Sequence, residues 1–178
     1  MRRNNGRFFW PVFLLVVAVD FFTKSLASRM DEGVPRELHA SWARLTLVHN
    51  QGAAFGLYVG EHSRWIFMVL TIIALVILAR LYSATRNGDI IRSVSLALVC
   101  GGAVGNLIDR IASAKGVIDF IDIGIGESRW PTFNVADMAV SIGAFLLAWV
   151  LWGEDTESET VGVATPATVP GADTREVS

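Results

Sequence analysis

The sequence predicts an α-helical membrane protein with four transmembrane helices and a small extracytoplasmic β-sheet. Of the 178 residues, 52% are hydrophobic and only 18% are charged, and the mean hydropathy is +0.46. The apolar residues gather in four blocks of roughly 17–20 residues, the length that crosses a hydrocarbon core of about 30 Å. Short strand-like runs lie between the first two blocks and between the last two. The four expected spans are residues 8–27, 65–81, 94–111 and 135–152.

The first apolar block could be a secretory signal peptide, because arginines precede it. However, Asp20 and Lys24 interrupt its second half, where the core of a signal peptide is uniformly apolar. We therefore interpret residues 8–27 as a retained first span.

Arginines predict the orientation of the chain. They precede the first span and surround the short link between the second and third spans, and loops rich in basic residues stay in the cytoplasm. Both termini are therefore expected in the cytoplasm, with residues 1–152 forming the membrane domain. Residues 153–178 are acidic, lack a core-forming pattern and are expected to be a disordered cytoplasmic tail. The six arginines in question are Arg2, Arg3, Arg7, Arg80, Arg86 and Arg92.

The outer segments predict the sheet, which is expected to form mainly from the first outer loop. That loop contains a short run from Leu45 to Val48, a turn at Asn50–Gly52 and a second run from Phe55. The segment "VIDFIDIGIG" between the third and fourth spans also alternates as strands do. Asp119 is therefore expected on an extended segment rather than within a helix.

Ionisable residues inside spans are costly and suggest function. Asp20 and Lys24 are four residues apart and can pair on one helix face, either to hold the bundle or to take part in chemistry. Lys24 could also extend to the membrane surface. In "GGAVGNLIDR", Gly102, Asn106 and Arg110 form one stripe with Asp109 beside it. For Arg110 we expect an architectural role, with backbone carbonyls, a substrate carbonyl or Asp109 as partners.

The segment "FNVAD" opens the fourth span. Asn134 suits the N-cap position, and Asp137 three residues later suits the positive end of the helix dipole. This arrangement is common without any chemistry, and Asp119 and Asp122 could be solvated loop acids. However, Asp119 and Asp137 both lie beside the outer membrane surface. Two carboxylates held close together in a dry site share one proton, which is the arrangement of aspartic proteases.

A metal site is not expected. The three histidines, His39, His49 and His62, all lie in the first outer loop without the spacing of metal ligands. No cofactor and no nucleic-acid partner are expected either.

Taken together, the motifs resemble those of lipoprotein signal peptidases (signal peptidase II), the bacterial inner-membrane aspartic endopeptidases. The resemblance covers residues 8–152 and rests on five motifs in the same order. They are Asp20 with Lys24, "NQGAAFG" at 50–56, "GGAVGNLIDR" at 101–110, "VIDF" at 117–120 and "FNVAD" at 133–137.

The resemblance implies cleavage of prolipoproteins immediately before a cysteine that carries diacylglycerol. It assigns the catalytic pair to Asp119 and Asp137, near the outer surface of the membrane, and gives Asp122 no role. The partners expected for this chain include membrane lipid, and the chain is expected to act as a monomer. The residues that would line or support the site are Asp20, Lys24, Asn50, Gly52, Gly102, Asn106, Arg110, Asn134 and Ala136.

Two other classes remain as alternatives at this point. A small transporter or proton channel could use Asp20, Asp109 and Asp137 as a relay, and a scaffold protein could use its polar residues only to join helices. Four short spans without a repeated half, and acids gathered at one edge, favour the peptidase.

Overall fold

Four long helices form the membrane domain in the computed structural model, which describes residues 5–38, 42–52 and 60–163. Each of the four is long and apolar enough to cross a membrane. Their positions confirm the expected spans, with boundaries that differ by a few residues at most ends. The helices are α1 (Gly6–Ala27), α2 (Ser63–Ala84), α3 (Ile90–Ala112) and α4 (Val135–Val163).

The part of α4 that could cross a membrane is Val135–Gly153, close to the expected span of residues 135–152. The helix itself continues to Val163, into the segment that was expected to be a disordered tail. The residues after 153 include several glutamates, which are good helix formers, and continuing the helix gives the last carbonyls of the span hydrogen-bond partners. The remainder of the tail lies outside the described residues.

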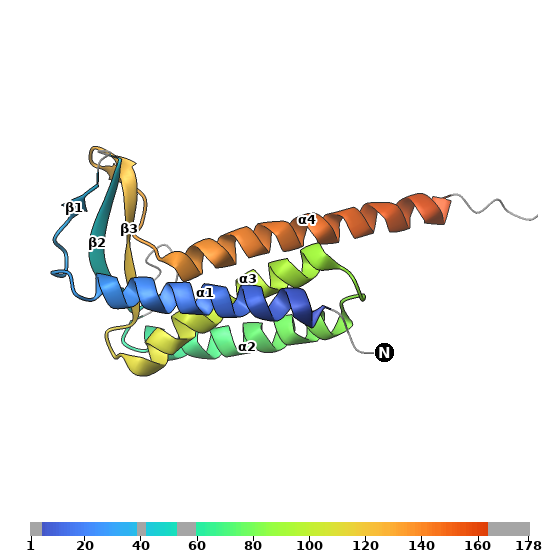
Figure 1. The fold of residues 1–178 in the computed structure, drawn as a ribbon, viewed down its shortest axis with the longest axis horizontal. Helices are drawn as coiled ribbons and strands as arrows, with labels where there is room; N and C mark the ends of the chain where they lie inside the picture. Colours follow the sequence, from blue (N-terminus) through green and yellow to red (C-terminus); the bar gives the residue numbers. More distant parts are fainter. Residues whose placement is uncertain (1–4, 39–41, 53–59, 164–178) are drawn as a thin grey trace, which may run out of the picture.

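The bundle is arranged around α3. This helix packs against α1, α2 and α4, whereas α4 lies at an angle to the other three and diverges from them toward its C-terminal end (Figure 1). Gly102 on α3 allows the closest approach, since a Cβ atom there would collide with the carbonyl oxygen of Ala136 on α4. Apolar side chains fill the space between α1, α2 and α3. The core of this cluster is Phe9, Leu78, Leu96, Ala97 and Cys100.

Asn5 fastens the end of the bundle that lies farthest from the sheet. Its side-chain amide nitrogen donates to the carbonyl oxygen of Arg86 at 2.8 Å, and its side-chain oxygen accepts from the backbone N–H of Gly88 at 2.9 Å. The start of α1 is thereby joined to the link between α2 and α3. These segments and the C-terminal end of α4 lie at the same end of the molecule (Figure 1).

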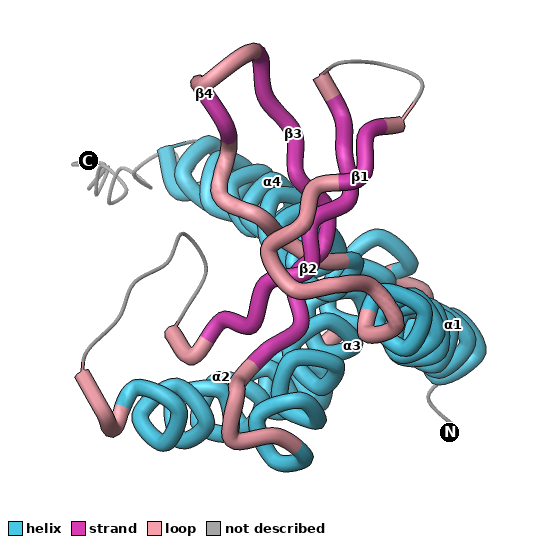
Figure 2. The backbone as a smooth tube through the Cα atoms, turned by 90° about the vertical axis from the view of Figure 1, so that its left-hand side faces the viewer, coloured by secondary structure: helices cyan, strands magenta, loops and turns pink. Residues whose placement is uncertain are grey.

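The sheet covers the opposite end of the bundle (Figure 2). It has four antiparallel strands in the order β1-β2-β3-β4, which confirms the small sheet expected from the sequence. The first outer loop supplies two strands, and the segment between α3 and α4 supplies the other two. The strands are β1 (Arg36–Glu37), β2 (Ala43–Asn50), β3 (Val117–Ile125) and β4 (Ser128–Arg129). The expected second run from Phe55 lies outside the described residues.

Candidate active site

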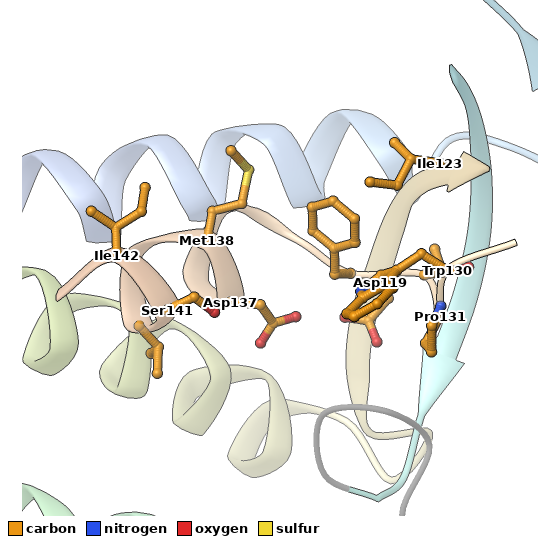
Figure 3. A pocket seen from close by; sticks show the side chains of 11 residues that line it. Asp119, Ile123, Trp130, Pro131, Asp137, Met138, Ser141 and Ile142 are labelled. Atoms are coloured by element: carbon orange, nitrogen blue, oxygen red, sulfur yellow. The ribbon is translucent and has the colours of Figure 1, made fainter. Parts of the chain in front are cut away.

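Asp119 and Asp137 come together where the sheet meets the bundle. Asp119 lies on β3, opposite Val48 of β2, so the prediction that it sits on an extended segment is confirmed. Asp137 lies in the first turn of α4, which begins at Val135. Both side chains line the same cavity, one from the strand side and one from the helix side (Figure 3).

Asn134 joins the two carboxylates. Its side-chain nitrogen donates to Asp119 Oδ1 at 2.6 Å, and its backbone N–H donates to Asp137 Oδ2 at 3.2 Å. Its side-chain oxygen accepts from the backbone N–H of Asp137 at 2.9 Å, which completes the N-cap expected from "FNVAD". One residue therefore begins the helix and fixes the separation of the two acids.

Two further amides complete the surroundings of the pair. Asn50 Nδ2 donates to Asp119 Oδ2 at 3.0 Å, and the Asn50 side-chain oxygen accepts from the backbone N–H of Gly52 at 2.9 Å. Asn106 Nδ2 donates to Asp137 Oδ1 at 2.8 Å. Among the residues that the structure describes, the groups that donate to the two carboxylates are therefore neutral amides of side chains and of the backbone.

Lys24 determines which way the Asn106 amide faces. Asn106 Oδ1 accepts from Lys24 Nζ at 2.9 Å and from Asn134 Nδ2 at 3.1 Å. Because that oxygen is occupied by two donors, the amide nitrogen is left to donate to Asp137. The expected contribution of Lys24 to the site thus acts through Asn106.

Lys24 is held inside the protein by two other carboxylates. Its Nζ lies 2.7 Å from Asp20 Oδ2 and 2.8 Å from Asp109 Oδ2, and only 3% of the residue is exposed. The pairing of Asp20 with Lys24 is as expected from their spacing, and of the two alternatives for Lys24 the structure shows the buried ion pair rather than an extension to the surface. Two carboxylates and an amide oxygen satisfy all three N–H groups of the ammonium, so it gains nothing from water.

Asp20 also connects α1 to the start of α4. Its Oδ1 accepts from the backbone N–H of Ala136 at 2.9 Å, one of the N–H groups that the first turn of a helix leaves unpaired. A Cβ atom at Gly105 would lie 2.5 Å from Asp20 Oδ2, so only glycine leaves room for this carboxylate. Ala136 and Gly102 therefore support the site through the backbone, by bringing α3 and α4 together.

Arg110 holds the turn that carries Asn50. Its Nη2 donates to the carbonyl oxygen of Gly52 at 2.8 Å, and its Nη1 donates to the carbonyl oxygen of Asn106 at 3.3 Å. The expected bonds to backbone carbonyls are thus present. Asp109, the other expected partner, instead binds Lys24 and accepts from the backbone N–H of Ile118 at 3.2 Å.

The surroundings of Asp119 favour its neutral form. Burial, and after it the charge of Asp137, raise the pKa of Asp119 to about 7, although the amide bonds from Asn50 and Asn134 act in the opposite direction. Only 2% of Asp119 is exposed, whereas Asp137 is half-buried at the positive end of α4. The pair therefore suits one shared proton.

Two cavities meet at Asp119. The first, of about 400 Å³, has a mostly apolar wall formed by α4 and the segment between β4 and α4. The second, of about 380 Å³, is bordered by β2 and the turn after it, including His49, Asn50 and Gln51. Asp119, Pro131 and Thr132 line both cavities. An extended chain could pass across Asp119 from one cavity into the other.

Some supporting residues were not found from the sequence. Gly105 was visible only as a member of "GGAVGNLIDR", and Asp109 was expected as a partner of Arg110 rather than of Lys24 on α1. Arg64 was also missed: its Nε donates to the carbonyl oxygen of Arg110 at 2.6 Å and ties α2 to the end of α3. Asp122, interpreted as a possible solvated acid, is buried and bound by Arg44 and Arg129. Within the described residues, no group of three His, Cys, Asp or Glu side chains lies close enough to hold a metal ion.

A four-span bundle with two amide-bound carboxylates beside an apolar cavity defines a membrane-embedded site of the aspartic-peptidase type. The family model of signal peptidase II matches residues 12–153. The chain therefore belongs to the signal peptidase II family. This membership favours a peptidase over a transporter or a scaffold.

Individual relatives agree with the family assignment. The lipoprotein signal peptidase of Syntrophotalea carbinolica is 39% identical over 156 residues, which cover 85% of this chain and 95% of that protein. The lipoprotein signal peptidase of Francisella tularensis subsp. novicida is 38% identical over 137 residues, covering 75% and 84%. A solved structure of a bacterial membrane enzyme has a TM-score of 0.73 at 32% identity, covering 82% of this chain and 88% of that chain.

Proposed function

We propose that Asp119 and Asp137 are the catalytic pair with which this signal peptidase II cleaves prolipoproteins immediately before the diacylglyceryl-modified cysteine. The observation that carries the proposal is the pair itself: two carboxylates that face one cavity, joined by Asn134 and bound by neutral amides. A cation between them would keep both ionised, whereas neutral donors leave one proton to be shared. The lipid-bearing substrate implies contact with membrane lipid.

The roles of the two aspartates follow from their surroundings. Asp119 carries the shared proton at rest and donates a hydrogen bond to the scissile carbonyl, since burial raises its pKa to about 7. We assign the role of the base to Asp137, which is held by the first turn of α4 and by Asn106. It takes a proton from water, whose oxygen adds to the carbonyl carbon. The C–N bond then breaks as a proton passes to the leaving amine.

The other site residues hold this arrangement. Asp20, Lys24 and Asn106 form one chain of hydrogen bonds from α1 to Asp137. Arg110 and Gly52 fix the turn at Asn50, which binds Asp119. In our proposal none of these residues exchanges a proton with the substrate.

The orientation that we propose places the sheet and the catalytic pair at the outer surface of the bacterial inner membrane, with both termini in the cytoplasm. Its support is the arginine distribution, together with the position of the N-terminus and the α2–α3 link at the end opposite the sheet (Figure 1). The substrate cysteine would then reach the site from the outer leaflet. The protein would act as a monomer, because the pair and its supports come from one chain. We also propose that it needs neither metal nor nucleic acid.

The proposed function is tested by incubating the purified protein in detergent or lipid with a diacylglyceryl-modified precursor and with the same precursor lacking the lipid. We expect cleavage of the modified precursor before its cysteine and little cleavage of the other. A chelator should leave the rate unchanged. Loss of activity with a chelator and recovery with zinc would contradict the aspartic mechanism.

A further inference from the structure

Asp122 is a buried carboxylate that the catalytic site does not use. Its Oδ2 accepts from Arg44 Nε at 2.6 Å and from Thr46 Oγ1 at 3.1 Å, both on β2. Its Oδ1 accepts from Arg129 Nε at 2.8 Å, and its backbone oxygen accepts from Arg129 Nη2 at 3.0 Å. The guanidinium of Arg129 therefore binds both the side chain and the backbone of one residue.

The backbone beside Asp122 is irregular. Arg129 pairs with Gly124 and Phe133 pairs with Ile121, so three residues of the returning segment lie opposite two residues of β3. The extra residue makes a β-bulge at Pro131–Thr132. Backbone bonds resume on both sides: the N–H of Trp130 donates to the carbonyl oxygen of Ile123 at 2.8 Å, and Phe133 exchanges two bonds with Ile121.

Arg129 binds β3 beside the bulge. The carbonyl oxygens of the residues on either side of Asp122 accept from the returning segment, whereas that of Asp122 itself accepts from Arg129 Nη2. Pro131 has no N–H and donates nothing to β3. The bulge is thus fixed by the side chain of Arg129, which binds Asp122. Asp122 and Asp119 are three residues apart on β3, so their side chains lie on opposite faces of the sheet.

The bulge lies where the two cavities meet. Pro131 and Thr132 line both of them, as does Asp119. Figure 3 shows Pro131 beside Asp119 in the first cavity. A peptide bond held between Asp119 and Asp137 would place the residue before the cysteine within a side chain's length of this wall. The first cavity is the apolar one and extends along α4, so it suits the signal-peptide side of the bond.

We propose that Arg129, through Asp122, is a positioning residue that fixes the Pro131–Thr132 bulge as the wall selecting the residue on the signal-peptide side of the cleaved bond. The inference rests on the proposed catalytic pair. A packed wall distinguishes side chains that differ by one methylene by about 10- to 200-fold, and a loosened wall loses this discrimination. In our proposal Arg129 contacts neither the substrate nor the carboxylates of Asp119 and Asp137.

The experiment compares two diacylglyceryl precursors that differ only at the residue before the cysteine, glycine in one and valine in the other. The readout is the ratio of their kcat/KM values, which does not depend on the fraction of active enzyme. In our proposal the wall excludes the larger valine, so the wild type should cleave the glycine precursor preferentially. We expect Arg129→Gln to lower this preference at least about fivefold. Thr132→Ala, which opens the wall without touching the ion pair, should lower it in the same direction.

Arg44→Gln is the matched control, because it removes the same charge from the same carboxylate but leaves the bonds of Arg129 in place. Its ratio should stay within about twofold of the wild type, even if its unfolding temperature falls as much as that of Arg129→Gln. An unchanged ratio in Arg129→Gln and Thr132→Ala, or an equal change in Arg44→Gln, would overturn the proposal. Failure of the wild type to cleave either precursor would instead refute the peptidase function on which it rests.

Discussion

Two pairs of carboxylates lie side by side at the end of the bundle that the sheet covers, and they differ in the groups that bind them. Asp20 and Asp109 both bind the ammonium of Lys24, at 2.7 and 2.8 Å. Asp119 and Asp137 are bound by the amides of Asn50, Asn106 and Asn134. The first pair is bound by a cation and is structural in our proposal, whereas the second shares a proton.

The comparison teaches that the counter-charge, rather than the number of buried acids, determines the chemistry. The two pairs are also connected, because Lys24 and Asp137 bind opposite ends of the Asn106 side chain. Lys24, which is held by Asp20 and Asp109, therefore orients the Asn106 amide group that donates to Asp137. Replacing single members of each pair should separate their roles.

The largest effect is expected from the catalytic pair. Asp119→Asn and Asp137→Asn should each lower the rate of precursor cleavage by at least about 10³-fold, because a carboxamide can neither share the proton nor take one from water. Both proteins should still fold, since a carboxamide has the size of the carboxyl group and its single oxygen keeps one of the two amide bonds that each aspartate accepts. The control is Glu127→Gln, an exposed acid in the β3–β4 turn, which should keep its activity. Near-normal turnover in either aspartate variant would refute the assignment.

Lys24→Met should mainly damage stability. It leaves Asp20 and Asp109 facing each other without a cation, and breaking a buried pair in this way costs about 3–5 kcal/mol. Thermal unfolding in detergent measures the loss. Adding Asp20→Asn to Lys24→Met should restore part of the stability. A single variant as stable as the wild type would show that Lys24 is not the counter-charge of this pair.

The pH dependence of stability should change when Asp119 is removed. Its pKa is about 7 in the folded protein and near 3.8 when unfolded, so the folded state holds a proton that the unfolded state releases between these values. The contribution of Asp119 is fully present below pH 3.8 and lost as the pH rises through 7. From pH 5 to pH 7 the wild type should therefore lose about 2–3 kcal/mol more than Asp119→Asn. Denaturant unfolding at the two pH values measures the difference, and parallel curves would contradict it.

Arg110→Lys should have a smaller effect on activity. Lysine keeps the charge but cannot bind the carbonyl oxygens of Gly52 and Asn106 with a planar fork, so the turn carrying Asn50 would shift. We expect kcat/KM to fall about 10- to 100-fold, the usual consequence of a displacement of about 1 Å at a site. The pH–rate profile should keep its shape. A large shift of the profile with little loss of maximal rate would show that Arg110 tunes the pair directly.

The parts of the site that sequence reasoning found are those with a local signature. The spacing of Asp20 and Lys24 predicts their ion pair, and "FNVAD" predicts the cap formed by Asn134 and Asp137. The four spans follow from hydropathy in the same way. The catalytic pair was suggested by two acids at one membrane edge, and the resemblance made the assignment specific.

The parts that were missed depend on contacts between distant segments. Lys24 and Asn106 are 82 residues apart, and no periodicity shows that they meet. Asp122 follows the same alternating pattern as a solvated strand acid, and only its pairing with Arg44 across β2 and β3 shows that it is buried. The loss of apolar residues after residue 152 marks the end of the expected span. It does not mark the end of the helix, which continues to Val163.

The pH dependence of kcat/KM for the wild-type enzyme tests the shared proton most directly, because it reports the pKa values of the free enzyme. Cleavage of a diacylglyceryl precursor should be followed between pH 4 and 9 in one detergent. We expect a bell-shaped profile whose alkaline limb falls near pH 7, where Asp119 loses its proton. A rate that stays level or still rises between pH 7 and 9 would contradict a proton shared by Asp119 and Asp137.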